Sequence, residues 1–211
     1  MGNVATYRVS ELGLFPLPLV LLPTERVPLH IFEERYRELI GECLDSGDEF
    51  GIVYADDDGV RDIGTRARVT EVLARMADGR MDILVEGGDR FRLLELTTGR
   101  SFHTGDVSPV EDEEDPAGPE SIERALGLFD LLRELTGSDV DVPDADTAQL
   151  SFVLAGRVEL PSDDKLVLLR DVSERSRIDR VCDLLEDAAS KAQHVRGAAE
   201  RAATNGRVQL G

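Results

Sequence analysis

Ser162 and Lys165 have the residue types of a catalytic serine–lysine pair. A lysine amine buried in an apolar pocket can take the proton of a serine hydroxyl and make that serine a nucleophile. Ser162, however, follows Leu160-Pro161 at the predicted start of a short helix, where serine typically caps the first turn. That position leaves the amine of Lys165 exposed, so the pair is predicted to be structural.

The histidines and the aspartate run predict no metal site. The three histidines fall in three separate predicted elements, and none has a cysteine at metal-ligand spacing: His30, His103 and His194. His30 lies between two apolar residues and is expected to pack or to form a hydrogen bond. The run at 56–58 lacks the later ligands of a calcium loop and is predicted to be a hairpin tip. No metal ligand is therefore predicted.

The two cysteines also predict no active site. Cys43 and Cys182 occupy apolar positions of predicted helices, which indicates buried thiols in a reducing compartment. A chain with no candidate nucleophile, base or phosphate-binding loop offers no catalytic or cofactor-binding residue. The chain is therefore predicted not to be an enzyme and to need no cofactor.

The charge of the chain bounds its partners. Its 211 residues include 43 acidic and 24 basic side chains, a net charge of −19. Such a charge repels phosphate backbones and anionic lipid, so nucleic acid and membranes are not expected partners, whereas basic or apolar peptide segments are. No apolar stretch approaches the length of a membrane span, and a cytoplasmic location is predicted. Salt adaptation and genome composition both remain open as the origin of the acidity.

The elements that position these residues begin with an apolar run cut by four prolines at 14–36. Proline removes a backbone donor, so the run predicts two short edge strands, 14–20 and 27–31, rather than a helix or a central strand. A helix is predicted from Glu33 to Gly47. Its apolar stripe consists of Phe32, Tyr36, Leu39, Ile40 and Cys43.

Alternating apolar residues predict further strands at 65–75, 81–85 and 91–96. Turns are predicted at 77–79 and at 87–89, because glycine accepts positive φ. An acidic, proline-flanked segment at 109–119 reads as a solvated linker. Beyond it the apolar period becomes helical, with predicted helices at 119–136, 147–158 and 162–169 and a long one capped by Ser173.

Successive motifs of the first half follow one another in a recognisable order: the run at 14–36, Phe50-Gly51-Ile52-Val53, Asp62-Ile63-Gly64-Thr65, Asp78-Gly79-Arg80-Met81-Asp82-Ile83, Glu86-Gly87 and Arg90-Phe91-Arg92-Leu93-Leu94-Glu95. Together they resemble the amino-terminal, substrate-binding domain of ATP-dependent Lon proteases, which also occurs as a free-standing protein. Neither lysine lies in a Gly-x-x-x-x-Gly-Lys-Ser/Thr loop, so the chain is similar to the free-standing form without ATPase or peptidase domains.

The resemblance implies an α+β fold. A β-rich PUA-like pseudobarrel with one packed helix is expected at 1–108. The acidic linker at 109–119 follows, and an α-helical bundle ending in a long helix is expected at 120–211. Residues of the motifs are expected to be structural, with Arg35 and Arg90 in ion pairs. These residues are Glu33, Arg35, Tyr36, Gly64, Glu86, Gly87, Arg90 and Phe91.

The resemblance also implies a function, the non-catalytic binding of unfolded or apolar polypeptide segments for presentation in protein quality control. The edge strands suggest the binding surface; its candidate residues are Phe15, Leu17, Leu19, Leu21 and His30. For each of them, closing the core is the competing interpretation. The alternative function is an adaptor that docks a protease or other complex through its helical half. The oligomeric state is left open.

Overall fold

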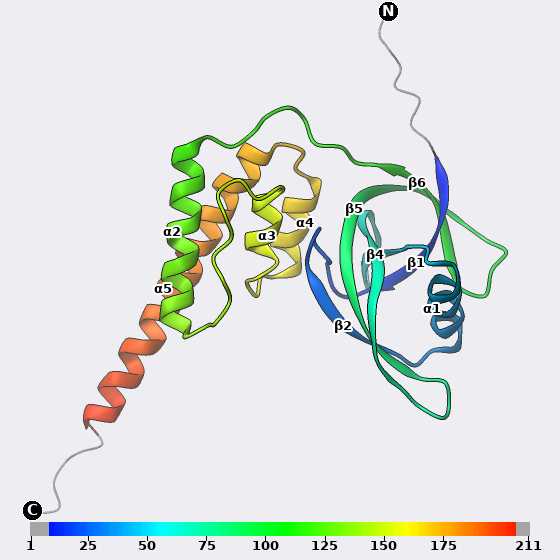
Figure 1. The fold of residues 1–211 in the computed structure, drawn as a ribbon, viewed down its shortest axis with the longest axis horizontal. Helices are drawn as coiled ribbons and strands as arrows, with labels where there is room; N and C mark the ends of the chain where they lie inside the picture. The colour runs from blue at the N-terminus through cyan, green and yellow to red at the C-terminus, as the bar shows by residue number, and fades with distance from the viewer. Residues whose placement is uncertain (1–8, 206–211) are drawn as a thin grey trace, which may run out of the picture. The chain divides into compact units, whose positions relative to one another are not determined.

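The first half of the chain forms a six-stranded sheet with one helix packed on it (Figure 1). The structure is a computed structural model and describes residues 9–205. Its first elements are β1 (Ser10–Leu17), β2 (Arg26–Ile31), α1 (Glu34–Ser46), β3 (Phe50–Asp56), β4 (Gly59–Arg75), β5 (Met81–Thr97) and β6 (His103–Pro109). Two strands form in the proline-broken run, as predicted, and β2 lies at an edge. The prediction of an edge strand is wrong for β1, which ends at Leu17 and pairs with β3 on one side and β6 on the other.

The sheet closes on itself through β5. The strand order is β2-β5-β4-β3-β1-β6, and β5 pairs with β6 as well. The first half of β5 lies between β2 and β4, and its second half lies between β4 and β6. Closure leaves β2 outside the ring with a single partner strand. The predicted α+β fold with a β-rich barrel is therefore confirmed.

The predicted turn at 87–89 is wrong, because β5 continues through it to Thr97. A side chain at Gly87 would place its Cβ 2.1 Å from the carbonyl oxygen of Leu22. The backbone of Gly87 instead accepts a hydrogen bond from Thr24 at 2.8 Å and donates one to Glu25 at 2.9 Å. The glycine serves a close approach between the segment after β1 and β5.

Helix α1 covers the core of the sheet with Tyr36, Leu39, Ile40 and Cys43, as its periodicity predicted. Gly47 ends the helix in the left-handed conformation, with φ of 78°. Phe32 does not join this face. The helix begins only at Glu34, and the side chain of Phe32 on the extended segment before it is 60% exposed.

The chain divides into two compact units, and the division differs from the predicted one. The sheet unit comprises residues 1–113 and 155–172, so it includes α4 (Ser162–Arg170). The helical unit comprises residues 114–154 and 173–211. Residues 1–8 and 206–211, which the predicted division included, lie outside the described part of the chain.

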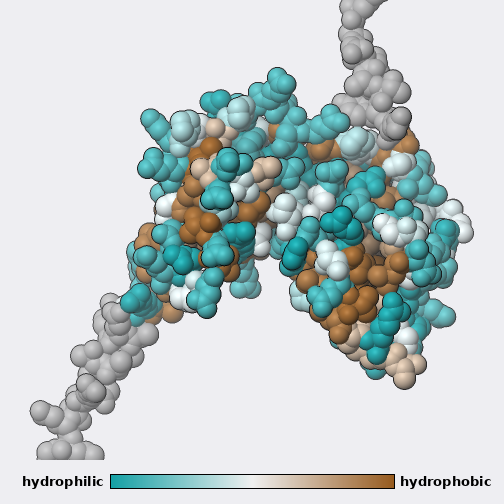
Figure 2. Space-filling view, in the orientation of Figure 1, coloured by the Kyte–Doolittle hydropathy of each residue, from teal (hydrophilic) through white to brown (hydrophobic). Residues whose placement is uncertain are grey.

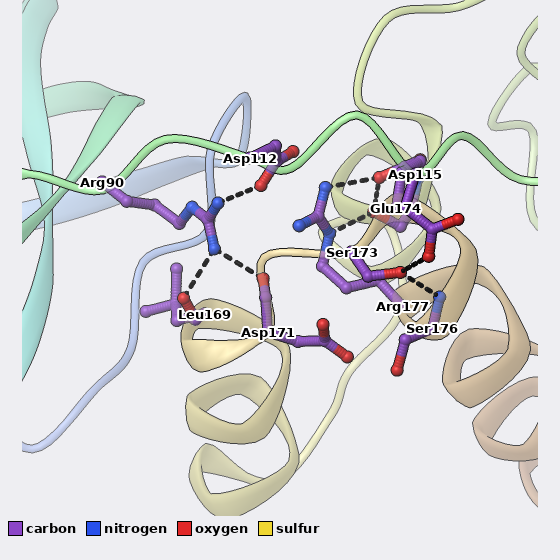
Figure 3. Close-up of polar contacts among 10 residues, drawn as sticks. Arg90, Asp112, Asp115, Leu169, Asp171, Ser173, Glu174, Ser176 and Arg177 are labelled. Atoms are coloured by element: carbon purple, nitrogen blue, oxygen red, sulfur yellow. Dashed lines mark hydrogen bonds and ion pairs between the residues drawn. The ribbon is translucent and has the colours of Figure 1, made fainter. Parts of the chain in front are cut away.

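Arg90 explains why α4 belongs with the sheet (Figure 3). Its side chain is 4% exposed, and Nη1 donates to the carbonyl oxygens of Leu169 at 2.8 Å and Asp171 at 2.7 Å. Nη2 pairs with the carboxylate of Asp112. The first part of the predicted linker is therefore anchored, because an arginine fork can satisfy helix-end carbonyls and a carboxylate together.

The helical unit contains α2 (Pro119–Thr136), most of α3 (Leu150–Ala155) and α5 (Glu174–Asn205). Helices α2 and α5 pack against each other. Pro119 starts α2, Gly137 ends it, and the hydroxyl of Ser173 accepts from the amide of Ser176 at 3.0 Å (Figure 3), as predicted. Helix α3 is shorter than the predicted 147–158, because Gln149 takes a left-handed φ of 52°.

Asp115 and Arg177 hold the helical unit at the start of α5. Asp115 accepts from the hydroxyl of Ser173 at 2.7 Å and from Arg175 at 2.9 Å, and the Ser173 bond first and then Arg175 lower the pKa of this carboxyl. Arg177 is fully buried; it donates to Ser151 at 3.0 Å and lies 4.4 Å from the ring centre of Phe152. No residue pattern in the sequence predicted that this arginine would be buried.

Candidate functional site

The five predicted surface residues separate into buried and accessible ones. Phe15 and Leu21 are 6% and 1% exposed and belong to the core, so they are not available as a surface. Phe15 stacks on the ring of Tyr36 at 3.9 Å between centroids. Leu17 and Leu19 are half-buried at the edge of the same core, and His30 is exposed.

An apolar rim surrounds the core at this edge. We define it as the half-buried side chains that pack against the core cluster from three strands and the corner after β1: Leu17, Leu19, Val27, Val69 and Val72. We also count in the rim two large apolar residues that are more exposed, Phe32 directly after β2 and Leu73 on β4 at 49%. Figure 2 shows apolar side chains gathered on the sheet unit around the β4–β5 hairpin.

Val72 and Leu73 were not predicted as part of this surface, because the pairing of β4 with β5 is irregular. Its register shifts between Val69 and Glu71 and again between Val72 and Ala74. Each shift moves the following side chains relative to the two faces of the sheet, so simple alternation no longer predicts which of them point inward.

The strand edges near the rim are poor templates for an added strand. β2 has one free edge, and Pro28 in its centre has no amide hydrogen to donate. β4 pairs with β3 only as far as Ala67, and its outer half carries the register shifts. Prolines and bulges are devices that protect sheet edges. The rim therefore offers side-chain contact rather than backbone pairing.

Ion pairs border the rim on the outer face of β2 and β5. Nδ1 of His30 lies 2.6 Å from a carboxylate oxygen of Asp82, and the His30 ring stacks on Phe32 with 5.9 Å between centroids. Arg26 pairs with Glu86 at 2.6 Å. His30 and Arg26 are 46% and 63% exposed, so the pairs contribute little to stability and these two side chains are accessible to a partner.

The motif residues around α1 form a local contact set. Arg35 pairs with Glu33 at 2.7 Å and lies 4.6 Å from the ring centre of Tyr36. Burial raises the pKa of the Tyr36 hydroxyl, partly offset by Arg35. Both partners of the ion pair are about 40% exposed, which makes it a weak pair.

The remaining motif residues lie within the sheet. Gly64 has no room for a side chain, since a Cβ there would lie 2.5 Å from the carbonyl oxygen of Ile52 and 2.6 Å from the ring of Phe91. Phe91 is fully buried in a second apolar cluster. Glu86 accepts from Arg26 and lies 3.7 Å from Arg68. The structural roles predicted for these residues fit their positions.

Lys165 is not exposed, contrary to the prediction. Its ammonium lies 2.5 Å from a carboxylate oxygen of Glu25 and 3.5 Å from the carbonyl oxygen of Val20, and the side chain is 13% exposed. The predicted cap by Ser162 is also absent: α4 begins after Pro161 without a side-chain cap bond. The ion pair between Lys165 and Glu25 connects α4 to the segment after β1, at one end of the rim.

A polar cleft of about 1010 Å³ lies beside α1, and the buried Cys43 is among the residues that line it. Burial, together with Asp48 and Glu42, raises the pKa of the Cys43 thiol to about 11, so it is protonated at neutral pH. Burial also raises the pKa of Cys182. Among residues 9–205, no group of three or more His, Cys, Asp or Glu side chains could hold a metal ion.

Within the described part of the chain, no helix combines the length and the apolar character needed to cross a bilayer. The candidate site is thus an apolar rim on a rigid barrel, bordered by charged pairs.

Comparison with known proteins shows which family the chain matches. The family model of the ATP-dependent protease La (LON) substrate-binding domain matches residues 11–187. Lon protease 2 of Myxococcus xanthus is 26% identical over 189 residues, covering 80% of this chain and 23% of that protein. Lon protease of Anaeromyxobacter dehalogenans is 27% identical over 189 residues, with 80% and 22% covered. The chain spans about a quarter of the length of these curated relatives.

Solved structures show the same fold. The crystal structure of a Lon N-terminal domain protein from Xanthomonas campestris superposes with a TM-score of 0.66 and 28% identity, covering 82% of this chain and 96% of that one. The N-terminal domain of the Mycobacterium avium complex Lon protease gives a TM-score of 0.64 at 20% identity, with 86% and 98% covered.

Proposed function

Because the chain belongs to the family of the ATP-dependent protease La (LON) substrate-binding domain, we propose that it holds unfolded or apolar polypeptide segments on the apolar rim of its barrel. The Lon N-terminal substrate-binding domain is a non-catalytic module, and its name indicates that it binds protein substrates. We propose further that this chain binds clients and presents them in protein quality control without catalysing a reaction itself.

The accessible apolar rim is the observation that carries the proposal. Its side chains are half-buried by the core beneath them, so they are rigid before a client arrives and lose little entropy on binding. Covering each remaining exposed portion contributes on the order of 1 kcal/mol. A few such contacts support micromolar binding and release, which suits a module that passes on its client.

Matched leucine variants test the rim. Leu73 on β4 and Leu94 on β5 are equally exposed, at 49% and 50%. Leu94 lies in the second half of β5, which pairs with β6 and is away from the rim. We expect Leu73→Ser and Phe32→Ser each to weaken binding of a labelled, reduced and alkylated unfolded protein by about 3–10-fold, a loss of about 1 kcal/mol. Leu94→Ser should bind as the unchanged chain does.

Fluorescence anisotropy measures the binding, and thermal unfolding shows that the variants are folded. Equal effects of Leu73→Ser and Leu94→Ser would exclude the rim as the binding surface. The alternative function, docking of a larger complex through the helical unit, predicts that neither rim variant changes complex formation. The cytoplasmic location and the absence of nucleic-acid and membrane partners stay predictions.

A further inference from the structure

Helix α2 and the loop after it enclose a second apolar surface, wholly within the helical unit. This groove has a volume of about 570 Å³, and its apolar lining is formed by Pro119, Ile122, Leu126, Gly127, Val142 and Ala145. Figure 2 shows apolar side chains gathered along α2 and this loop. Only part of the apolar surface of α2 is buried: Ala125, Phe129 and Leu132 are buried, whereas Ile122 and Leu126 line the groove.

Gly127 keeps the groove open. It lies in the middle of α2, where glycine is less stable than alanine by about 0.5–1 kcal/mol. A Cβ at this position would meet no atom within 4 Å, so packing among the described residues does not require glycine. Its missing side chain leaves free space where the groove would otherwise be filled.

The charges around the groove are acidic. Glu123 and Asp130 line it. The loop at 138–149 contributes four aspartates and no lysine or arginine: Asp139, Asp141, Asp144 and Asp146. Arg133 offsets part of this charge, because it pairs with Asp130 at 2.6 Å, whereas Arg124 pairs with Glu186 on α5 at 2.8 Å. The acidic residues still outnumber the basic ones around the groove. An apolar occupant with basic flanks complements these surroundings.

We propose that this groove is a docking site for a basic amphipathic helix of a partner protein. The apolar side chains of that helix occupy the space beside Gly127, and its lysines or arginines face Glu123 and the loop aspartates. The volume lies within the usual range of ligand sites, and an apolar groove that receives one face of a helix is a recurrent mode of peptide recognition. The site is separate from the rim and does not depend on it.

Two labelled peptides of about four helical turns test the charge and the groove together. Both carry leucines at helical i, i+3, i+4 and i+7 positions; one has lysine at the remaining positions and the other has glutamate. We expect the lysine peptide to bind the full chain by fluorescence anisotropy, more weakly as salt rises from about 0.05 M to about 0.5 M. The glutamate peptide should not bind. Equal binding of the two peptides would overturn the proposal.

Two glycine variants locate the binding. Gly127→Phe fills the groove, and we expect at least a tenfold loss of lysine-peptide affinity with unchanged or higher thermal stability. Gly41→Phe is the matched control, because Gly41 lies within α1 and a Cβ there also meets nothing within 4 Å. It should bind the peptide normally. A folded Gly127→Phe variant that still binds, or a Gly41→Phe variant that loses binding equally, would refute the docking site.

Discussion

Replacing Arg90 by alanine should detach the end of α4 from the barrel. The substitution removes the donors to the carbonyl oxygens of Leu169 and Asp171 and the partner of Asp112. Hydrogen bonds from a charged donor contribute about 1.5–3 kcal/mol each, and breaking a buried ion pair costs about 3–5 kcal/mol. Asp112 is 29% exposed and regains water, so its share is small. We expect a loss of about 3–5 kcal/mol in the free energy of unfolding.

Urea unfolding followed by far-UV circular dichroism measures this loss, because the chain has no tryptophan to report by fluorescence. With a slope of about 2 kcal/mol per molar urea, the midpoint of the sheet unit should fall by about 2 M. Hydrogen exchange should show the lost protection first in α4, the element that Arg90 holds.

Arg92→Ala is the matched control on the same strand. Arg92 is 48% exposed and pairs with Asp62 at 2.8 Å, so its removal should cost no more than about 1 kcal/mol. If both variants unfold at the same urea concentration, the buried fork of Arg90 contributes no more than a surface pair and the reasoning fails.

Three further predictions follow from single contacts. Gly87→Ala should destabilise the sheet by about 3 kcal/mol, because its Cβ would lie 2.1 Å from a backbone oxygen. Gly88→Ala is the control and should change thermal stability little, since the nearest atom to its Cβ would be 3.4 Å away. Similar melting temperatures of the two variants would contradict this. The pKa of Cys43 is raised from 9.0 to about 11, so at pH 8 its thiol should be alkylated about 100-fold more slowly in native than in unfolded protein. Mass spectrometry measures the two rates, and equal rates would disprove the prediction. The stability that this neutral thiol contributes is present below about pH 9 and is lost as the pH rises through about 11. Arg35→Ala should lower the melting temperature by a few degrees through its lost contact with Tyr36, and unchanged melting with lost client binding would instead make Arg35 a client contact.

Local signals predicted the elements of the fold well. Prolines indicated extended strands in place of a helix at β1 and β2, glycines ended α1 and α2, and Ser173 capped α5. Each of these signals acts within one turn of the chain, so the residue type alone carries the information. The closure of β5 onto β6 was not predictable in the same way, because pairing between distant strands leaves no trace in either strand's period.

Long-range polar contacts explain why the sequence predicted neither the division into units, with α4 in the sheet unit, nor the burial of Arg177. Arg90 meets carbonyl oxygens about 80 residues further along the chain, and Arg177 is buried among Ser151, Glu174 and Phe152. An arginine in sequence indicates an exposed side chain until its partners are known.

The candidate site was predicted only in part, because backbone irregularity hides which side chains face inward. Leu17 and Leu19 remained at the surface, while Phe15 and Leu21 went into the core. Burial along β1 does not alternate, since Leu14 and Phe15 are both buried, so the period of two could not separate the residues. Val72 was not predicted for a similar reason, because it follows a register shift on β4.

The sheet unit is discontinuous along the chain, and this sets an order for its maturation during synthesis. Residues 1–113 leave the ribosome with every strand present but with Arg90 and Glu25 lacking their partners on α4 and its end. Those partners follow roughly 60 residues later, which at bacterial or eukaryotic elongation rates is a delay of about 3–12 s. The nascent sheet unit therefore lacks these contacts with α4 while the segment that belongs to the helical unit is still being made.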